Sequence, residues 1–250
     1  MLKLDESYFY KLRKVVFDRL NPGGVVIYLV GLWMFSLVML GLATWILQLA
    51  KKNIIVSDFI NSVYLIFVTL FLILFVYLIM CIFSERFLYK TQKVASLCMV
   101  LYTIIMSVEP LFLCYLFSLD GTWGSGFGNW IVISVSIGLI QLGLYFIFVW
   151  RGVVQGSLKA DGHGLFTNNN TQKLIKVNII SYVCLVVWLF FIVGLSSKII
   201  GPIVFLFLCF ALTAAVQEFI ILTICKYRFR SFDISYEEGT KYRMKKSKRS

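Results

Sequence analysis

Two acidic side chains lie inside long apolar stretches of this 250-residue chain. Glu109 falls in the stretch 94–118 and Glu218 in the stretch 201–225. An ionised carboxylate at the centre of a bilayer costs at least about 2–3 kcal/mol, so such residues are functional candidates by default. We therefore take Glu109 and Glu218 as candidates for lining a substrate or ion path. The alternative is structural: both are neutral or hydrogen-bonded within the protein, or reach an interface.

The neighbours of the two acids sharpen this prediction. Glu109 precedes Pro110, which removes a backbone N–H and is expected to kink the helix. Glu218 follows Ala214 by one helical turn, on a face with small residues, so we expect Glu218 to face protein, with Gln217 beside it. Both acids fall on the third helix of a three-helix half, and the halves would have opposite orientation. This is the geometric pattern of an inverted repeat, which many secondary transporters use.

A third embedded polar residue, Gln141, lies in the stretch 129–150. Ser134 and Gly138 precede it and form a pair of small residues four positions apart, which permits close packing of helices. Interhelical packing explains Gln141 adequately. We also include it among the candidates for a substrate or ion path.

The apolar stretches hold few residues suited to catalysis or metal binding. A membrane protease needs a His or Lys base near its nucleophile, but His163 is in a polar loop and no Lys lies inside an apolar stretch. Clustered zinc ligands and an Asp dyad inside the stretches are also absent. We therefore expect no enzyme, no metal site and no cofactor. The cysteines form no CxxC motif and act as small apolar residues: Cys81, Cys98, Cys114, Cys184, Cys209 and Cys225.

The elements that carry these residues are six apolar stretches of about 19 to 27 residues, each long enough to cross a bilayer core about 30 Å thick. Hydrophobic residues make up 60% of the chain and charged residues 14%, whereas soluble domains carry about a quarter charged residues. The sequence therefore predicts an all-α, multi-pass membrane bundle in the region 25–225. The predicted spans are 25–50, 58–84, 94–118, 129–150, 177–195 and 201–225.

The first 24 residues predict an amphipathic helix at the membrane interface. Apolar residues recur at helical spacing on one side, and charged residues occupy the other. Asn21 and Pro22 then end this helix before the first span. An ordinary cytosolic helix is the alternative. The apolar side comprises Leu4, Tyr8, Leu12, Val15, Val16 and Leu20, and the charged side Lys11, Arg13, Lys14 and Asp18.

The distribution of basic residues predicts the topology. With both termini in the cytoplasm, 21 of the 24 Lys and Arg residues fall in cytoplasmic segments, as the positive-inside rule requires. The net charge of +12 then indicates anionic lipid headgroups as the partner, and no nucleic acid. The basic tail 226–250 is expected to be disordered and drawn to anionic lipid; the alternative is a tail that only solubilises and orients the chain. The predicted lipid anchors are Lys11, Arg13, Lys14, Lys245, Lys246, Lys248 and Arg249.

Two functional classes follow. The first is a small permease, or the membrane subunit of a transport or export system. The second is a non-catalytic accessory, assembly or immunity protein that binds another membrane protein. In general plan, with Glu85 after the second span, the chain resembles permease subunits of type-2 ATP-binding-cassette exporters, which implies an ATPase partner. It departs from them in its long loop 151–176 and its short link 196–200.

Overall fold

A computed structural model describes residues 4–18, 20–53, 58–120, 126–164, 169–194 and 199–247. These residues form helices and turns, without a strand. Six of the helices are long and apolar enough to cross a membrane, which confirms the predicted all-α six-helix bundle. They are α2 (Pro22–Asn53), α3 (Asp58–Phe83), α5 (Gln92–Phe117), α6 (Phe127–Val154), α7 (Asn169–Val193) and α8 (Ile200–Arg228).

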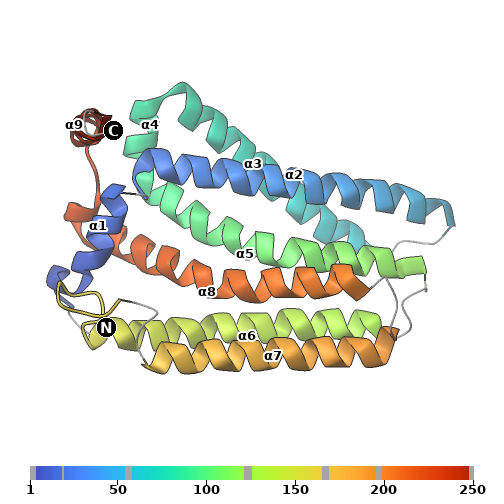
Figure 1. Ribbon diagram of the computed structural model, residues 1–250. Helices are drawn as coiled ribbons and strands as arrows, with labels where there is room; N and C mark the ends of the chain where they lie inside the picture. Colours follow the sequence, from blue (N-terminus) through green and yellow to red (C-terminus); the bar gives the residue numbers. More distant parts are fainter. Residues whose placement is uncertain are drawn as a thin grey trace.

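Helix α5 lies at the centre of the bundle (Figure 1). It packs between α2 and α8, while α3 lies outside α2 and the pair α6 and α7 lies beyond α8. Of its most apolar 18 residues, 56% are buried, against 17% in α3 and 11% in α7. Helices α3 and α7 therefore present most of their surface to lipid, whereas α5 holds the bundle together.

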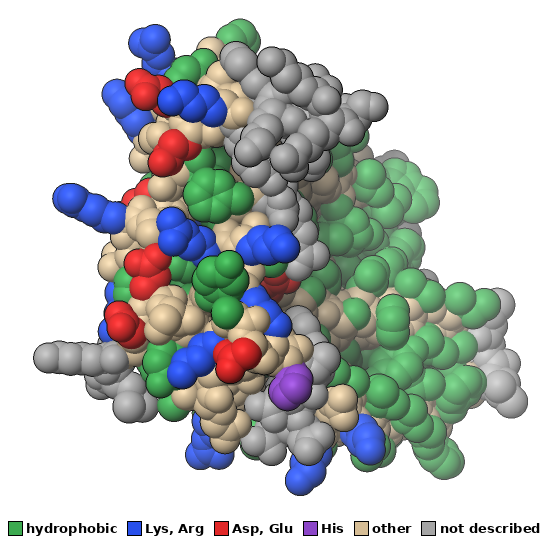
Figure 2. Space-filling view, turned by 60° about the vertical axis from the view of Figure 1, so that its left-hand side comes forward, with side chains coloured by type: hydrophobic (Ala, Val, Ile, Leu, Met, Phe, Trp, Pro, Cys, Tyr) green, Lys and Arg blue, Asp and Glu red, His purple; other side chains and the backbone are tan. Residues whose placement is uncertain are grey.

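The short elements gather at one end of the bundle (Figure 1). They are α1 (Tyr10–Asp18), α4 (Glu85–Lys90) and α9 (Tyr236–Ser247), and both chain termini lie at the same end. Figure 2 shows Lys and Arg side chains gathered over this end, among Asp and Glu side chains, next to a hydrophobic flank. We call it the basic end and define it as residues 4–21, 84–91, 155–164 and 229–247; the opposite end is the far end.

The predicted amphipathic helix is present as a short 3-10 helix, Glu6–Phe9, followed by α1. Its apolar face packs against the bundle, because Phe9, Leu12 and Val16 are each at most 1% exposed. The ring of Phe9 lies 5.6 Å from that of Phe229, between centroids. This differs from the expectation that the apolar face lies in lipid: protein covers it, because the loop after α6 and the segment after α8 supply the apolar partners.

The expectation of a disordered C-terminal tail is wrong for residues 229–247. Phe232 and Ile234 are at most 2% exposed, so this segment packs into the basic end. Helix α9 then begins with a capping box, in which Ser235 N–H donates to Glu238 Oε2 and Glu238 N–H donates to Ser235 Oγ. Charge composition predicts disorder here, but two apolar anchors and a cap are enough to order the segment. We call residues 229–235 the strap.

Candidate functional site

Glu109 lies on α5 and faces α2. The residue is 3% exposed, and Ser36 Oγ lies 3.0 Å from Oε1 and 2.8 Å from Oε2 of its carboxyl group. Ser36 is therefore the hydrogen-bond partner of the acid, and no basic side chain forms an ion pair with it among the described residues. The pair joins α2 to α5 inside the bundle. Glu109 is therefore hydrogen-bonded within the protein, as the structural alternative predicts.

The fully buried polar residue near the middle of α8 is Gln217, and Glu218 is half-buried beside it. Gln217 Nε2 donates to the carbonyl oxygen of Leu142 on α6 at 3.2 Å and to that of Thr213 at 3.1 Å. Gln141, next to Leu142, is 5% exposed. The side-chain oxygens of Gln141 and Gln217 are buried without a hydrogen-bond partner among the described residues, at a cost of about 1–3 kcal/mol each.

Polar side chains line the basic half of the contact between α5 and α8, and we call this contact the seam. Every member is at most 9% exposed, although each has a hydroxyl, amide or ammonium group. Two hydrogen bonds cross between the helices: Thr223 Oγ1 donates to the carbonyl oxygen of Ser96 at 3.1 Å, and Lys226 Nζ donates to Gln92 Oε1 at 3.0 Å. The members are Gln92, Ser96, Thr103 and Ser107 on α5, and Thr213, Thr223 and Lys226 on α8.

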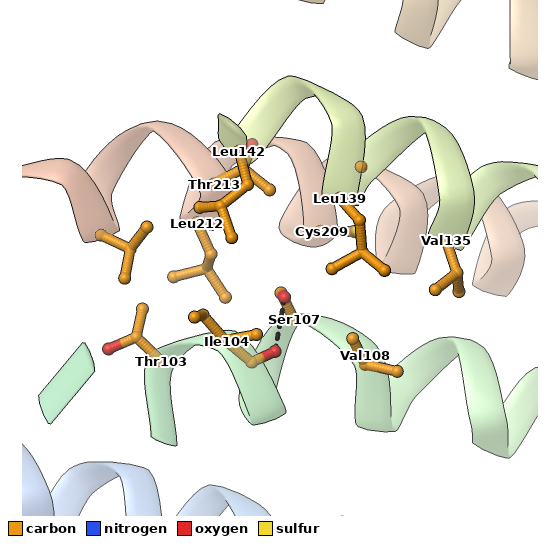
Figure 3. Close-up of a pocket in the computed structure, with 12 residues that line it drawn as sticks. Thr103, Ile104, Ser107, Val108, Val135, Leu139, Leu142, Cys209, Leu212 and Thr213 are labelled. Carbon is orange, nitrogen blue, oxygen red and sulfur yellow. Dashed lines mark hydrogen bonds between the residues drawn. The ribbon is translucent and has the colours of Figure 1, made fainter. Parts of the chain in front are cut away.

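The seam ends at a small cavity between α5, α6 and α8 (Figure 3). Thr103, Ser107 and Thr213 line the cavity, together with Cys209 and otherwise apolar side chains. The hydroxyl groups donate to backbone carbonyls of their own helices, as Ser107 does to Ile104 at 2.6 Å. The cavity volume is about 10 Å³, which admits no more than about one water molecule. In this structure the seam is therefore closed at this cavity.

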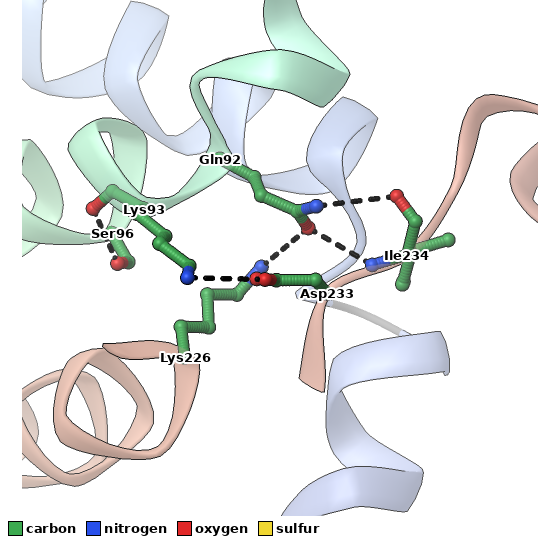
Figure 4. Close-up of polar contacts among 6 residues, drawn as sticks. All are labelled: Gln92, Lys93, Ser96, Lys226, Asp233 and Ile234. Carbon is green, nitrogen blue, oxygen red and sulfur yellow. Dashed lines mark hydrogen bonds and ion pairs between the residues drawn. The ribbon is translucent and has the colours of Figure 1, made fainter. Parts of the chain in front are cut away.

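The mouth of the seam at the basic end is a cluster around Lys226 (Figure 4). Lys226 is 0% exposed, and among the described residues Gln92 Oε1 is the partner of its ammonium group. The nearby carboxylate of Asp233 pairs instead with Lys93, at 3.3 Å between Nζ and Oδ2. The Gln92 side chain also binds the strap, since its Oε1 accepts from Ile234 N–H and its Nε2 donates to the Ile234 carbonyl.

Sequence reasoning did not single out this cluster. Lys226 stands where the last predicted span ends, so the sequence groups it with the cytoplasmic basic residues. A signal was present on α5, because Gln92, Ser96, Thr103 and Ser107 recur at three to four residues or multiples of that spacing and so share one helical face. What the spacing does not show is that this face meets α8, where a lysine would be buried.

The predicted lipid anchors divide between different surroundings. Arg13 and Lys14 are exposed, and Arg13 forms an ion pair with Glu6 at 3.3 Å. The ammonium group of Lys11 instead donates to the carbonyl oxygen of Gly162, which ties α1 to the loop after α6. The side chains of Lys245 and Lys246 on α9, as well as residues Lys248 and Arg249, lie outside the part of the structure that is described.

The described residues contain no group of three or more His, Cys, Asp or Glu side chains that could hold a metal ion. The six cysteines are free thiols. Comparison of the chain with protein-family models, with curated proteins and with solved structures finds no match. The function of this multi-pass membrane protein is therefore inferred from the seam, its mouth and the surfaces around them.

Proposed function

We propose that this protein is a small permease, or the membrane subunit of a transport system, and that a small anionic solute passes along the seam between α5 and α8. The observation that carries the proposal is the burial of Lys226 at the mouth of the seam, where its partner is the neutral amide of Gln92. A buried charge that lacks an ion-pair partner is a functional candidate in a membrane protein.

The chemistry of the mouth favours an anion. A lysine ammonium has three N–H donors, and Gln92 takes one of them. The Asp233 carboxylate, which could neutralise Lys226, is engaged with Lys93. The other basic side chains of the basic end raise the local concentration of anions. An entering carboxylate or phosphate would therefore meet an ammonium group with two donors to spare.

The interior accounts for the rest of the proposed path. Beyond the mouth, hydroxyl and amide groups provide hydrogen-bonding partners as far as the cavity at Thr103, Ser107 and Thr213. Met99 lies on the same face of α5 between Ser96 and Thr103 and is 0% exposed, so it closes the seam midway. Passage requires α5 and α8 to move apart, as helices do in alternating access. Gln141 and Gln217 adjoin this path, whereas Glu109 faces α2 and is assigned a packing role.

The orientation is part of the proposal. The segments that form the basic end hold 12 of the 24 Lys and Arg residues, so the positive-inside rule favours a cytoplasmic position for this end and for both termini. Lys226 then receives solute from the cytoplasmic side or releases it there.

A second candidate function is supported by α7. This helix has 11% of its most apolar 18 residues buried, and a hollow of about 280 Å³ opens along it, between α6 and α8. The residues that line this hollow include Asn178, whose amide donates to Tyr145 Oη at 3.1 Å, and the small residues Ala211 and Ala214. Small residues let a helix of another membrane protein approach closely. An accessory or immunity protein that binds another membrane protein would use such a surface.

Thiol labelling tests the transport proposal without knowledge of the solute. Cys209 lines the cavity and is 2% exposed, so a variant that retains Cys209 alone reports on water access to the seam. We expect a small, negatively charged methanethiosulfonate reagent to label it in membrane vesicles whose basic end faces the reagent. Cys184 on the lipid-exposed side of α7, retained alone, is the matched control and should stay unlabelled by this reagent.

The second arm changes Lys226. In the Cys209-only protein, Lys226→Gln should slow labelling by the anionic reagent by about tenfold and leave labelling by an uncharged maleimide unchanged, because one attractive charge has been removed. The transport proposal fails if Cys209 reacts only with the maleimide, and not with the anionic reagent, at every pH and in both vesicle orientations. The seam is then interhelical packing. Loss of function on enlarging Ala211 and Ala214 would then favour the accessory role.

A further inference from the structure

We propose that the hollow between α4 and the strap binds the head group of a phospholipid, with the phosphate at Arg86 and Lys90 and the donor groups of the head at the acidic side chains opposite. The hollow has a volume of about 560 Å³ and lies at the basic end. It does not depend on the seam being a transport path. The class of ligand that this hollow selects is a phosphodiester whose head group ends in hydroxyl or ammonium donors.

One wall of the hollow is basic. Arg86 and Lys90 are four residues apart on α4, so their side chains lie on one face of the helix. Both are exposed, and neither forms an ion pair among the described residues. The helix that presents them is fixed in place, because Ser84 Oγ caps it by accepting from Phe87 N–H, and Tyr89 packs edge-to-face on Tyr236. Two held cations with free donors suit a phosphate group.

The opposite wall is acidic and belongs to the strap and the first turn of α9. Glu237 is exposed, and Asp233 Oδ1 is buried without a hydrogen-bond partner among the described residues. A bare phosphate would be repelled by these carboxylates. A head group with a donor beyond its phosphate satisfies both walls, since glycerol supplies hydroxyl groups and ethanolamine supplies an ammonium group. Choline, with no N–H or O–H donor, leaves the acidic wall without a partner.

The surface that leads into the hollow indicates a lipid in place of a soluble phosphate ester. Ser84 alone separates the end of α3 from the start of α4. The last turn of α3 is turned outward, with Ile82 64% and Phe83 86% exposed. Acyl chains that lie along the end of α3 would therefore bring their head groups to the level of α4, whose Arg86 and Lys90 line the hollow. A phospholipid can occupy both surfaces at once, whereas a soluble ester uses the polar part only.

Lipid retention measured by native mass spectrometry tests this inference. The full-length protein is extracted from vesicles containing equal amounts of phosphatidylglycerol, phosphatidylethanolamine and phosphatidylcholine. We expect the first two lipids to be retained over phosphatidylcholine by at least about fivefold, the ratio that roughly 1 kcal/mol gives. Arg86→Gln with Lys90→Gln should reduce retention of all three lipids, and Glu237→Gln should lower the preference over phosphatidylcholine.

The matched control is Lys173→Gln with Lys176→Gln, which removes two exposed basic side chains on α7. It should leave retention within about twofold of the unchanged protein. Equal retention of phosphatidylcholine, or an equal loss in the control, would overturn the inference, because either result indicates a diffuse basic surface. Displacement of the lipids by millimolar glycerol 3-phosphate would also overturn it, since the site would then be one for soluble phosphate esters.

Discussion

The two halves of the contact between α5 and α8 are built differently, although the same two helices run through both. In the basic half, the helices meet through the seam, and two side-chain hydrogen bonds cross between them. In the far half, beyond the cavity, they meet through apolar side chains such as Leu111, Cys114 and Leu206. Among the described residues, the buried polar side chains of this contact lie in the basic half and at the cavity. One helix pair can therefore be held by apolar packing at one end and by side-chain hydrogen bonds at the other.

The largest effect is expected at Trp130 on α6, which belongs to the same apolar cluster as Leu111, Cys114 and Leu206. Its ring is 0% exposed, is stacked on Phe127 at 5.5 Å between centroids, and donates from Nε1 to the Leu185 carbonyl. Trp130→Ala should lower the free energy of unfolding by about 3–5 kcal/mol, measured by SDS titration in mixed micelles. Trp45, 56% exposed, is the control, and its replacement by Ala should cost less than about 1 kcal/mol. Equal effects at the two positions would mean that this apolar cluster contributes little to the stability of the bundle.

The next effect concerns the basic half, where hydrogen bonds replace packing. Gln92→Leu leaves the Lys226 ammonium and both backbone groups of Ile234 without their partner, and should cost about 2–4 kcal/mol. Lys226→Met should cost under about 1 kcal/mol, because removing a buried charge also removes its desolvation penalty. The double variant should therefore be more stable than Gln92→Leu alone, as a double-mutant cycle would show. Simple additivity would contradict the assigned contact.

A smaller effect is expected where the halves meet. A Cβ atom at Gly138 would lie 3.2 Å from Cys209 Sγ, which is a tight contact, so Gly138→Ala should cost about 1 kcal/mol. Gly143, on the same helix, has nothing within 4 Å of such a Cβ atom, and Gly143→Ala should be neutral or stabilise by up to about 1 kcal/mol. Thermal unfolding of the two variants checks both signs. A gain at Gly138 would show that α6 and α8 are loosely packed at the cavity.

The smallest effect is a pH dependence at the basic end. The Ser235 backbone N–H, and then its hydroxyl group, hold the pKa of Glu238 below its ordinary value. A lowered folded-state pKa means that the capping box stabilises α9 above the ordinary pKa of a glutamate and loses this contribution as the pH falls through the folded-state value. Amide hydrogen exchange in α9 should speed up over that acidic range. Glu238→Gln should remove the dependence, while Glu237→Gln, at an exposed neighbour, should keep it.

The sequence by itself determined the solvent and the number of spans. Apolar stretches as long as the bilayer is thick have few other ways to satisfy their backbone hydrogen bonds in lipid, so six helices follow from length and composition. It also placed Gln141, Glu109 and Glu218 inside spans. The sequence does not show which polar group of α8 is fully buried. Gln217 and Glu218 differ by about 100° around the helix, and only the position of α6 selects Gln217.

Tertiary structure decided which residues meet. Ser36 and Glu109 are 73 positions apart, and Gln92 and Lys226 are 134 apart. The burial of Lys226 exists only because the start of α5, the end of α8 and the strap converge at the basic end. Hydropathy reports how each residue partitions between water and lipid, one helix at a time. Contacts between helices depend on how each is rotated and on which helix is its neighbour, and both are set by packing across the whole bundle.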